Sequence, residues 1–188
     1  MAKMGTNDLR SGMKVEIDNE PYNIITIEFV KPGKGPAFNR LRIKHLTTGR
    51  VLEKTYKSGE KLDIADIEES KMRLLYQDQE GATFMHDLTF DQLTVPHDKL
   101  GESAHWLKEE AIYDILFYNG QVLTVAAPNF LELKITSTEP GARGDTASGR
   151  VMKAAIVETG AKIQIPIFVE EGEIIKVDTR TSEYVSRV

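Results

Sequence analysis

The sequence predicts an all-β protein made of three small β-barrels. Of its 188 residues, 43 are Ile, Val or Thr, whose branched side chains fit a pleated sheet better than a helix. Apolar and polar residues alternate over many short segments, which are separated by turns rich in glycine, proline or asparagine. The turns divide the chain into residues 1–64, 65–128 and 129–188, and we expect one barrel from each part.

The first part predicts a barrel of SH3-like size. Met13, Val15 and Ile17 alternate with polar residues, which places all three on one face of a strand. A turn over residues 19–21 leads into the second strand. The expected strands of this part are residues 13–18, 22–30, 40–44 and 51–56.

The second part combines strands with one predicted helix. Asn119-Gly120 lies between two apolar runs and is a strong signal for a tight hairpin. Residues 102–111 predict a helix, because Leu107 and Ala111 stand four positions apart with Trp106 beside them, and we expect this stripe to face the core. The expected strands are residues 72–77, 82–86, 115–118 and 122–125.

The third part predicts a strand over residues 130–136, a flexible loop over residues 140–149 and then a meander. The expected strands of the meander are residues 151–157, 162–168, 173–179 and 183–188.

The second and third parts are weakly similar when Gly120 is placed on Gly172. Leu123 then coincides with Ile175, and several other apolar positions also agree. Two explanations stay open: the chain holds two copies of one barrel, or any two alternating hairpins agree this well.

The first third of the chain is basic although the whole chain carries a net charge of −5. Residues 1–64 hold 12 Lys/Arg against 8 Asp/Glu, whereas residues 65–188 hold 12 against 21. No acidic residue lies between Glu28 and Glu53, and the cations of this stretch are Lys31, Lys34, Arg40, Arg42, Lys44 and Arg50. Clustered cations favour an anionic partner such as a phosphate backbone, and a solvated strand face is the alternative interpretation.

Lys34 has a distinctive setting within this cluster. It lies between Gly33 and Gly35, with Pro32 and Pro36 outside them. Proline restricts the backbone and glycine permits a tight reversal without a neighbouring side chain, so we expect a narrow tip that presents one long cationic side chain. The spacing is not that of a nucleotide-binding P-loop.

Composition excludes several classes of protein. The chain has no cysteine, so it has no disulfide framework, thiol nucleophile or thiolate metal site. No apolar run approaches the ~20 residues of a membrane span, and the N-terminus lacks the apolar core of a secretory signal. The four histidines lack metal-ligand spacing, and no pair of carboxylates is placed for acid–base chemistry. We therefore expect a cytoplasmic protein that is not an enzyme and needs no metal, cofactor or membrane. We also expect it to be a monomer.

Several segments resemble the elongation factor P family of bacteria. Residues 31–38, Lys-Pro-Gly-Lys-Gly-Pro-Ala-Phe, resemble the loop that carries the family's modified lysine, and residues 165–188 resemble its C-terminal ending. Residues 128–133 and 144–146 match further family segments. The resemblance runs in colinear order along essentially the whole chain.

The resemblance implies an L-shaped protein in which a KOW/SH3-like N-terminal barrel precedes two OB-fold barrels. It also implies a translation elongation factor that mimics tRNA in outline. Such a factor binds the ribosome, through rRNA and both subunits, beside the peptidyl-tRNA. There it stimulates peptide-bond formation and relieves stalling at consecutive prolines.

The resemblance further implies roles for individual residues. Lys34 corresponds to the lysine that many bacteria extend with a β-lysyl group and that archaeal and eukaryotic relatives carry as hypusine, so a lysine-modifying enzyme is an expected partner. Pro36 stands where lysylated members commonly have a polar residue, so the sequence does not predict the modifying group. The residues expected to bind tRNA or rRNA are Lys31, Pro32, Gly33, Lys34, Gly35, Arg40, Arg42 and Lys44. Those expected to contact mRNA or the small subunit are Gly144, Asp145, Thr146, Tyr184 and Arg187.

The alternative from another class is a protein-binding adaptor built of SH3-like and OB barrels. A proline-rich peptide ligand would favour the adaptor, whereas salt-sensitive binding to ribosomes would favour the translation factor.

Overall fold

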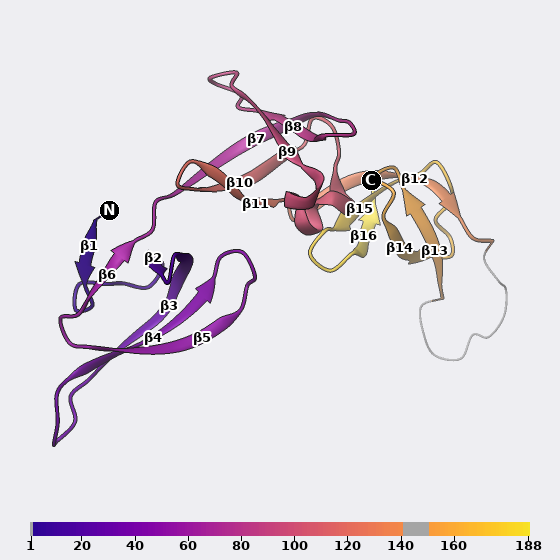
Figure 1. Cartoon of the computed structure of the whole chain (residues 1–188). Helices are drawn as coiled ribbons and strands as arrows, with labels where there is room; N and C mark the ends of the chain where they lie inside the picture. Colours follow the sequence, from indigo (N-terminus) through magenta and orange to yellow (C-terminus); the bar gives the residue numbers. More distant parts are fainter. Residues whose placement is uncertain (1, 141–150) are drawn as a thin grey trace. The chain divides into compact units, whose positions relative to one another are not determined.

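A computed structural model describes residues 2–140 and 151–188 and confirms the all-β architecture (Figure 1). The first sheet has six strands in the order β1-β6-β2-β3-β4-β5. Their bounds are β1 Lys3–Gly5, β2 Lys14–Ile17, β3 Glu20–Val30, β4 Phe38–His45, β5 Val51–Lys57 and β6 Lys61–Ile64. The short strands β1 and β6, which pair with each other, have too few residues to show a periodic pattern and were not predicted.

Apolar and polar residues alternate along β2 and β4, and the apolar ones form the core of this sheet. Val15, Leu41 and Ile43 are fully buried, as their period of two predicts. The turn between β2 and β3 corrects the expectation for residues 19–21. It consists of Asp18 and Asn19, which both have positive φ values, 54° and 61°. Two successive left-handed residues make the tight hairpin turn that matches strand twist, so β3 already begins at Glu20.

The middle sheet has five strands in the order β11-β10-β7-β8-β9. Their bounds are β7 Ile67–Gln77, β8 Gly81–Met85, β9 Gln92–Pro96, β10 Ile112–Tyr118 and β11 Gln121–Ala126. The predicted hairpin at Asn119-Gly120 is confirmed, because both residues have positive φ values, 50° and 76°. Sequence patterning missed the five-residue β9.

The predicted helix over residues 102–111 is wrong. Two 3₁₀ helices are present instead, η1 His97–Lys99 and η2 Gly101–Trp106. The Trp106 carbonyl accepts a hydrogen bond from the Tyr113 hydroxyl at 2.5 Å, and the backbone N–H of Glu110 donates to the Leu74 carbonyl at 2.9 Å. In an α-helix the Glu110 N–H would donate to the Trp106 carbonyl. Here both groups bond to residues outside the segment, so these tertiary hydrogen bonds replace the helical one.

The last sheet is a closed barrel in the order β12-β13-β14-β16-β15. Its strands are β12 Phe130–Thr138, β13 Met152–Val157, β14 Lys162–Pro166, β15 Ile174–Asp178 and β16 Glu183–Arg187. The predicted meander is wrong, because β15 pairs with β12 and β16 pairs in parallel with β14. The fully buried side chains of Leu133, Ile135, Ile165 and Ile175 fill this barrel.

The middle and last sheets share one pattern of strand neighbours. In each, the first strand pairs with the second and the fourth, the second with the third, and the fourth with the fifth. The topology is therefore repeated, but not in the alignment that the sequence suggested. Gly120 lies between the fourth and fifth strands, whereas Gly172 lies between the third and fourth. Apolar and polar residues alternate in the same way in every hairpin, so the alternation does not identify which hairpins of the two sheets correspond.

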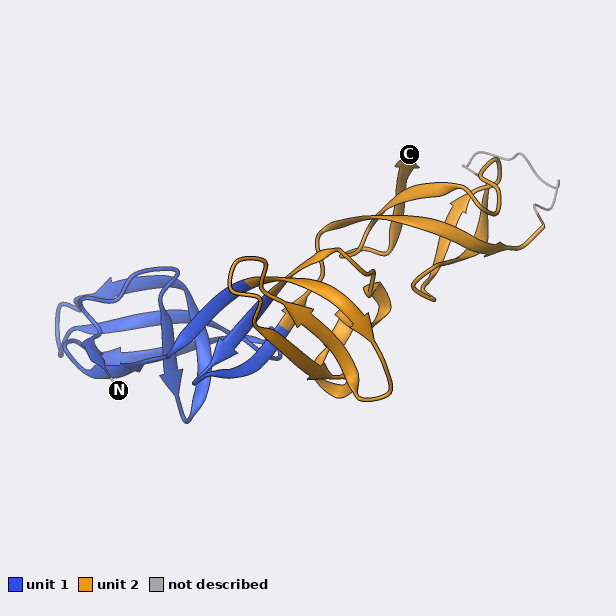
Figure 2. Ribbon diagram, turned by 90° about the horizontal axis from the view of Figure 1, so that it is seen from above, with its two compact units in different colours: residues 1–70, 115–124 blue, residues 71–114, 125–188 orange. Residues whose placement is uncertain are grey.

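The chain forms two compact units (Figure 2). The first contains residues 1–70 and 115–124, and the second contains residues 71–114 and 125–188. Within the first unit, the Tyr118 hydroxyl donates a hydrogen bond to the Glu16 carboxylate. Within the second, Trp106 is buried in the core of the closed barrel. No helix in the described part of the chain is long and apolar enough to cross a bilayer.

Candidate nucleic-acid interface

Lys34 lies at the tip of the long hairpin that β3 and β4 form (Figure 1). The ladder ends at the pair Val30–Phe38, and the seven residues between them make the tip. Lys34, Gly33, Gly35 and Pro36 are all exposed, and the φ of Gly35 is +109°. That backbone conformation is open to glycine and strained for other residues. The ammonium group of Lys34 is therefore held out in solvent, away from the sheet that carries it.

Strand alternation places the other predicted cations on the outer face of β4. Leu41 and Ile43 point into the core, so Arg40, Arg42 and Lys44 point the opposite way. Arg42 and Lys44 are exposed and Arg40 is half-buried. The structure thus brings these three side chains to one face of the same hairpin that carries Lys34.

Arg40 differs from its neighbours because it has internal acidic partners. Its guanidinium lies 3.4 Å from a carboxylate oxygen of Glu28 on β3 and 3.4 Å from one of Glu53 on β5. Both carboxylates are largely exposed, and exposed ion pairs contribute only about 0–1 kcal/mol each. A phosphate group could therefore displace them at small cost.

The remaining predicted cations of the hairpin have no such partner. Among the residues that the structure describes, no carboxylate lies within ion-pair distance of Lys31, Lys34, Arg42 or Lys44. Unneutralised like charges on one surface repel each other, and an anionic partner removes that repulsion. The arrangement suits the binding of a phosphate backbone.

Two residues at this site were not found by sequence reasoning. Asn39, the residue before Arg40, is buried on the inner face of β4, and its amide donates to the Thr6 hydroxyl at 3.1 Å and to the Asn7 side-chain oxygen at 2.9 Å. These bonds fix β4 against the loop after β1. Phe38, the residue before Asn39, lies on the same face as the cations, with its ring centre 5.9 Å from the Arg40 guanidinium carbon. The sequence feature that could have identified it is an aromatic residue at a strand end next to cations.

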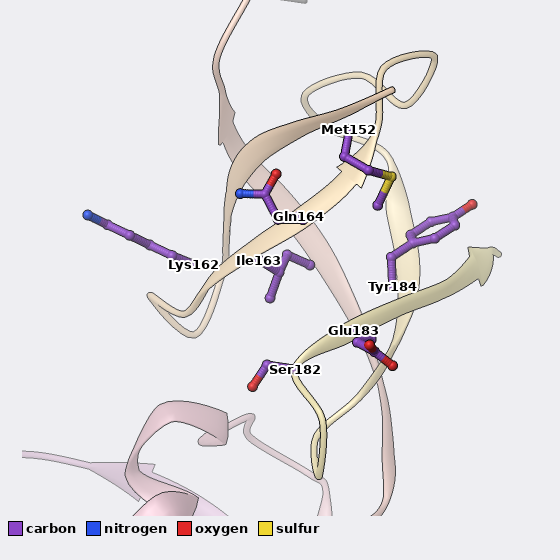
Figure 3. Close-up of a pocket in the computed structure, with 7 residues that line it drawn as sticks. All are labelled: Met152, Lys162, Ile163, Gln164, Ser182, Glu183 and Tyr184. Carbon is purple, nitrogen blue, oxygen red and sulfur yellow. The ribbon is translucent and has the colours of Figure 1, made fainter. Parts of the chain in front are cut away.

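The second group of predicted residues lies in the other compact unit. Tyr184 on β16 is half-buried, packs against the barrel core and lines a groove of about 540 Å³ (Figure 3). The groove lies where β14 and β16 diverge, and its lining residues are Met152, Lys162, Ile163, Gln164, Ser182, Glu183 and Tyr184. Gly144, Asp145 and Thr146 lie outside the described residues.

Arg187, near the end of β16, has internal partners of its own. Its guanidinium lies 3.3 Å from a Glu173 carboxylate oxygen and 5.2 Å from the centre of the Phe168 ring. The pKa of Glu173 is lowered, chiefly by the hydrogen bond from the Glu170 backbone N–H and further by Arg187. Arg187 is therefore less available to an external anion than Lys31, Arg42 and Lys44 of the β3–β4 hairpin.

The described residues contain no group of three or more His, Asp or Glu side chains placed to hold a metal ion. The chemistry that the hairpin offers is electrostatic: one projecting amine, a row of cations and the Phe38 ring beside Arg40.

Three family models match the chain in succession. The elongation factor P KOW-like domain matches residues 5–62, the elongation factor P OB domain matches residues 67–125, and the C-terminal domain of elongation factor P matches residues 131–187. Together they cover most of the chain and agree with the predicted order of a KOW-like barrel followed by OB folds.

Curated relatives match along the full length. Proteins named elongation factor P 2 from Protochlamydia amoebophila, Chlamydia muridarum and Chlamydia trachomatis are each 57% identical, over 100% of this chain and 99% of theirs.

Solved structures show the same fold at lower identity. The eukaryotic translation initiation factor 5A from Methanococcus jannaschii has a TM-score of 0.53 and 22% identity, over 67% of this chain and 92% of that one. An initiation factor 5A family protein from Naegleria fowleri has the same TM-score and 16% identity, over 66% of this chain and 97% of that one.

Proposed function

Because this chain belongs to the elongation factor P family of translation factors, we propose that it binds the ribosome beside the peptidyl-tRNA and promotes peptide-bond formation at consecutive prolines. Residues 1–64 would act as the KOW/SH3-like domain, and residues 65–128 and 129–188 as the two OB folds. The exposed amine of Lys34 at the end of the β3–β4 hairpin, with no described carboxylate within ion-pair distance, is the observation that carries this proposal.

The basic hairpin would contact RNA phosphates. Lys31, Arg42 and Lys44 have no carboxylate partner among residues 2–140 and 151–188, so each can take a phosphate partner. Each such contact releases counterions and adds to affinity. Arg40 would exchange Glu28 and Glu53 for phosphate. The backbone of Pro32, Gly33 and Gly35 would let the narrow tip enter a confined RNA site.

Lys34 would reach toward the peptidyl-transferase centre, lengthened by covalent modification from a lysine-modifying enzyme. The factor itself makes and breaks no bond of the peptide. Proline is a poor participant in peptide-bond formation because its ring restricts the geometry of attack. Holding the end of the peptidyl-tRNA in a reactive pose lowers the entropic and orientational part of the barrier.

Contacts to mRNA and the small subunit would come from Gly144, Asp145, Thr146, Tyr184 and Arg187. These contacts would be few and local, because residues 65–188 carry 21 Asp/Glu against 12 Lys/Arg. The hairpin would therefore supply most of the salt-dependent affinity.

Replacing the tip lysine tests the proposal directly. We expect Lys34→Ala to abolish the acceleration of Pro-Pro-Pro synthesis on purified ribosomes, because it removes the exposed amine that the tip carries between its two glycines. Lys61→Ala removes an exposed lysine of the same sheet at β6 and is the matched control. If Lys34→Ala sped synthesis at the unsubstituted rate, the proposed role would be wrong. The intact mass of the natively expressed protein, with peptide mapping across residues 31–40, identifies the modification.

A further inference from the structure

The tip that carries Lys34 is held to the rest of its sheet by very few hydrogen bonds. The β3–β4 ladder ends at the pair Val30–Phe38, so residues 31–37 lie beyond it. In the part of the chain that the structure describes, no hydrogen bond reaches residues 31–36. The carbonyl of Ala37 accepts one, at 3.0 Å, from the backbone N–H of Ser58, which directly follows β5. This bond is the last hold that the sheet has on the tip.

Side chains extend this bond into a closed ring at the root of the tip. The hydroxyl of Ser58 donates a hydrogen bond to the side-chain oxygen of Asn7 at 3.1 Å. The same oxygen accepts a second bond, at 2.9 Å, from the amide of Asn39. Asn39 follows Ala37 by two residues, so three hydrogen bonds and a short piece of backbone close the ring. A ring of this kind resists rotation better than a lone bond does.

The buried side chain of Thr6 fixes the ring to the body of the sheet. Its backbone N–H donates to the Glu60 carbonyl at 2.8 Å, and its hydroxyl donates to the Lys57 carbonyl at 3.1 Å. The same hydroxyl accepts a bond from the Asn39 amide at 3.1 Å. The loop after β1, the start of β4 and the end of β5 therefore meet in one hydrogen-bonded network. A satisfied polar network favours a single arrangement of the segments that it joins.

The root of the tip acts as the pivot of a lever. Lys34 precedes Ala37 by three residues, which span up to about 10 Å when extended. A rotation of about 10° at Ala37 would thus move the backbone of Lys34 by about 2 Å. A misplacement of about 1 Å in a positioned group can cost about 100-fold in rate. Small changes at the root are therefore large enough to matter at the amine.

We propose that Asn7 and Ser58 are positioning residues for Lys34, whose hydrogen bonds hold the root of the tip in one orientation. The inference rests on the proposed function and adds two residues outside the expected RNA contacts. Both side chains are exposed and uncharged, so the electrostatic attraction of the hairpin for phosphate does not depend on them. Their loss should lower the rate of the stimulated reaction and leave the affinity for ribosomes unchanged.

Substitutions of Ser58 test the ring at one bond. Ser58→Ala removes the hydroxyl and keeps the backbone N–H that holds Ala37. We expect its acceleration of Pro-Pro-Pro synthesis at saturating factor to fall about fivefold, the effect of one neutral hydrogen bond. Its ribosome affinity and the salt dependence of that affinity should stay those of the unsubstituted protein. Ser58→Thr keeps the hydroxyl, is the matched control and should accelerate synthesis normally.

Substitutions of Asn7 test the shared acceptor. Asn7→Leu removes the oxygen that receives both donors, so we expect a loss of about tenfold or more in the rate at saturating factor. Asn7→Asp keeps an acceptor oxygen there and should restore most of that rate. Because Asn7 and Ser58 are exposed, melting temperatures of all four variants should lie within about 4 °C of the unsubstituted value. Equal losses in Asn7→Leu and Asn7→Asp would overturn the proposal.

Spin labels measure the position of the tip without the ribosome. The chain has no cysteine, so Lys34→Cys combined with Arg50→Cys directs a label to each of these two positions. Electron–electron distance measurements should give a wider distribution when Ser58→Ala or Asn7→Leu is added, and an unchanged one with Ser58→Thr.

An unchanged distribution in both Ser58→Ala and Asn7→Leu would show that the positioning inference is wrong while the proposed function stands. If the unsubstituted protein failed to accelerate Pro-Pro-Pro synthesis, the proposed function would be wrong, and the distances would still show whether the ring holds the tip.

Discussion

Arg40 and Arg42 lie two residues apart on one face of β4, but their surroundings differ, and so do their expected contributions to RNA affinity. Glu28 and Glu53 partly neutralise Arg40, whereas no described carboxylate lies within ion-pair distance of Arg42. Binding phosphate through Arg40 means giving up two ion pairs, and binding through Arg42 costs none. Arg42 should therefore contribute more to RNA affinity.

This difference can be measured from the salt dependence of ribosome binding. We expect Arg42→Ala to reduce the slope of log affinity against log salt by about 0.7–0.9, the value for one phosphate contact. Arg40→Ala should reduce it by less, because its charge is already partly compensated. Glu28→Gln combined with Glu53→Gln should raise affinity. Equal slopes for the two arginine variants would contradict the assignment.

Tyr118 and Glu16 form a contact whose stability depends on pH. Burial, and then the hydrogen bond and negative charge of Glu16, raise the pKa of Tyr118 from 10.0 to about 12. The neutral phenol donates the bond, so its stabilising contribution is complete below pH 10. That contribution is lost as the pH rises from 10 to about 12.

Tyr118→Phe should lower the free energy of unfolding by about 1.5 kcal/mol at pH 8, since it removes a hydrogen bond to a charged group. The difference from the unsubstituted protein should shrink as the pH rises toward 12. Urea unfolding followed by circular dichroism at pH 8 and pH 11 measures both effects. A difference that stayed constant with pH would show that the hydrogen bond to Glu16 does not stabilise the fold.

At the scale of the strands, two glycines of the chain are required for different reasons. A Cβ on Gly81 in β8 would lie 2.0 Å from the carbonyl oxygen of Val95 in β9, so the space itself forbids a side chain. Gly120 has open space around it, but its φ is +76°. Only the backbone conformation matters there.

Alanine substitution should distinguish the two cases. We expect Gly120→Ala to cost about 1 kcal/mol, the cost of a left-handed residue with a Cβ. Gly81→Ala should cost about 3 kcal/mol or more, because β8 and β9 must separate to admit the methyl group. Thermal melts of both variants give the comparison, and similar melting temperatures would contradict it.

Strands were predicted correctly from the sequence where apolar and polar residues alternate over several positions, so that one face of the strand is apolar. Val15, Leu41 and Ile43 marked a buried face, and Asn119-Gly120 marked a turn, because these signals are local. It failed where partners far along the chain decide the structure. The bond from Tyr113 to the Trp106 carbonyl ends a helix that residues 102–111 favour locally. The parallel pairing of β14 with β16 likewise leaves no local signal.

The candidate site was predictable to a similar degree. The alternation of Arg40 and Arg42 with Leu41 fixed their direction, and the glycines around Lys34 indicated an exposed tip. The pairing of Arg40 with Glu53 depends on the register between β4 and β5, which the sequence does not specify. The roles of Tyr184 and Arg187 came from family resemblance alone and stay predictions.

At the scale of the whole molecule, Trp106 couples two stretches of sequence. It follows the middle sheet's β9, yet its ring is buried with the core of the closed barrel. This places residues 71–114 and 125–188 in one compact unit. The chain has one tryptophan, so its fluorescence reports on that unit.

We expect Trp106→Ala to lower the free energy of unfolding by about 3–5 kcal/mol, because a large buried side chain leaves a cavity. Trp106→Phe should cost less, since it keeps part of the ring volume. In the unsubstituted protein, fluorescence should change at the same urea concentration as the unfolding of the barrel followed by hydrogen exchange at β12. A fluorescence change at lower urea would show that the ring leaves before the barrel opens.

The closed barrel joins its last strand to β14 through a single register pair, Gln164 opposite Glu183. Breaking that pair would leave five strands in the order β14-β13-β12-β15-β16, which is the arrangement that β9, β8, β7, β10 and β11 adopt in the middle sheet. Separation of β14 from β16 would therefore leave all the other strand pairs of the barrel in place. It would convert the closed barrel into an open sheet with the same strand order as the middle sheet.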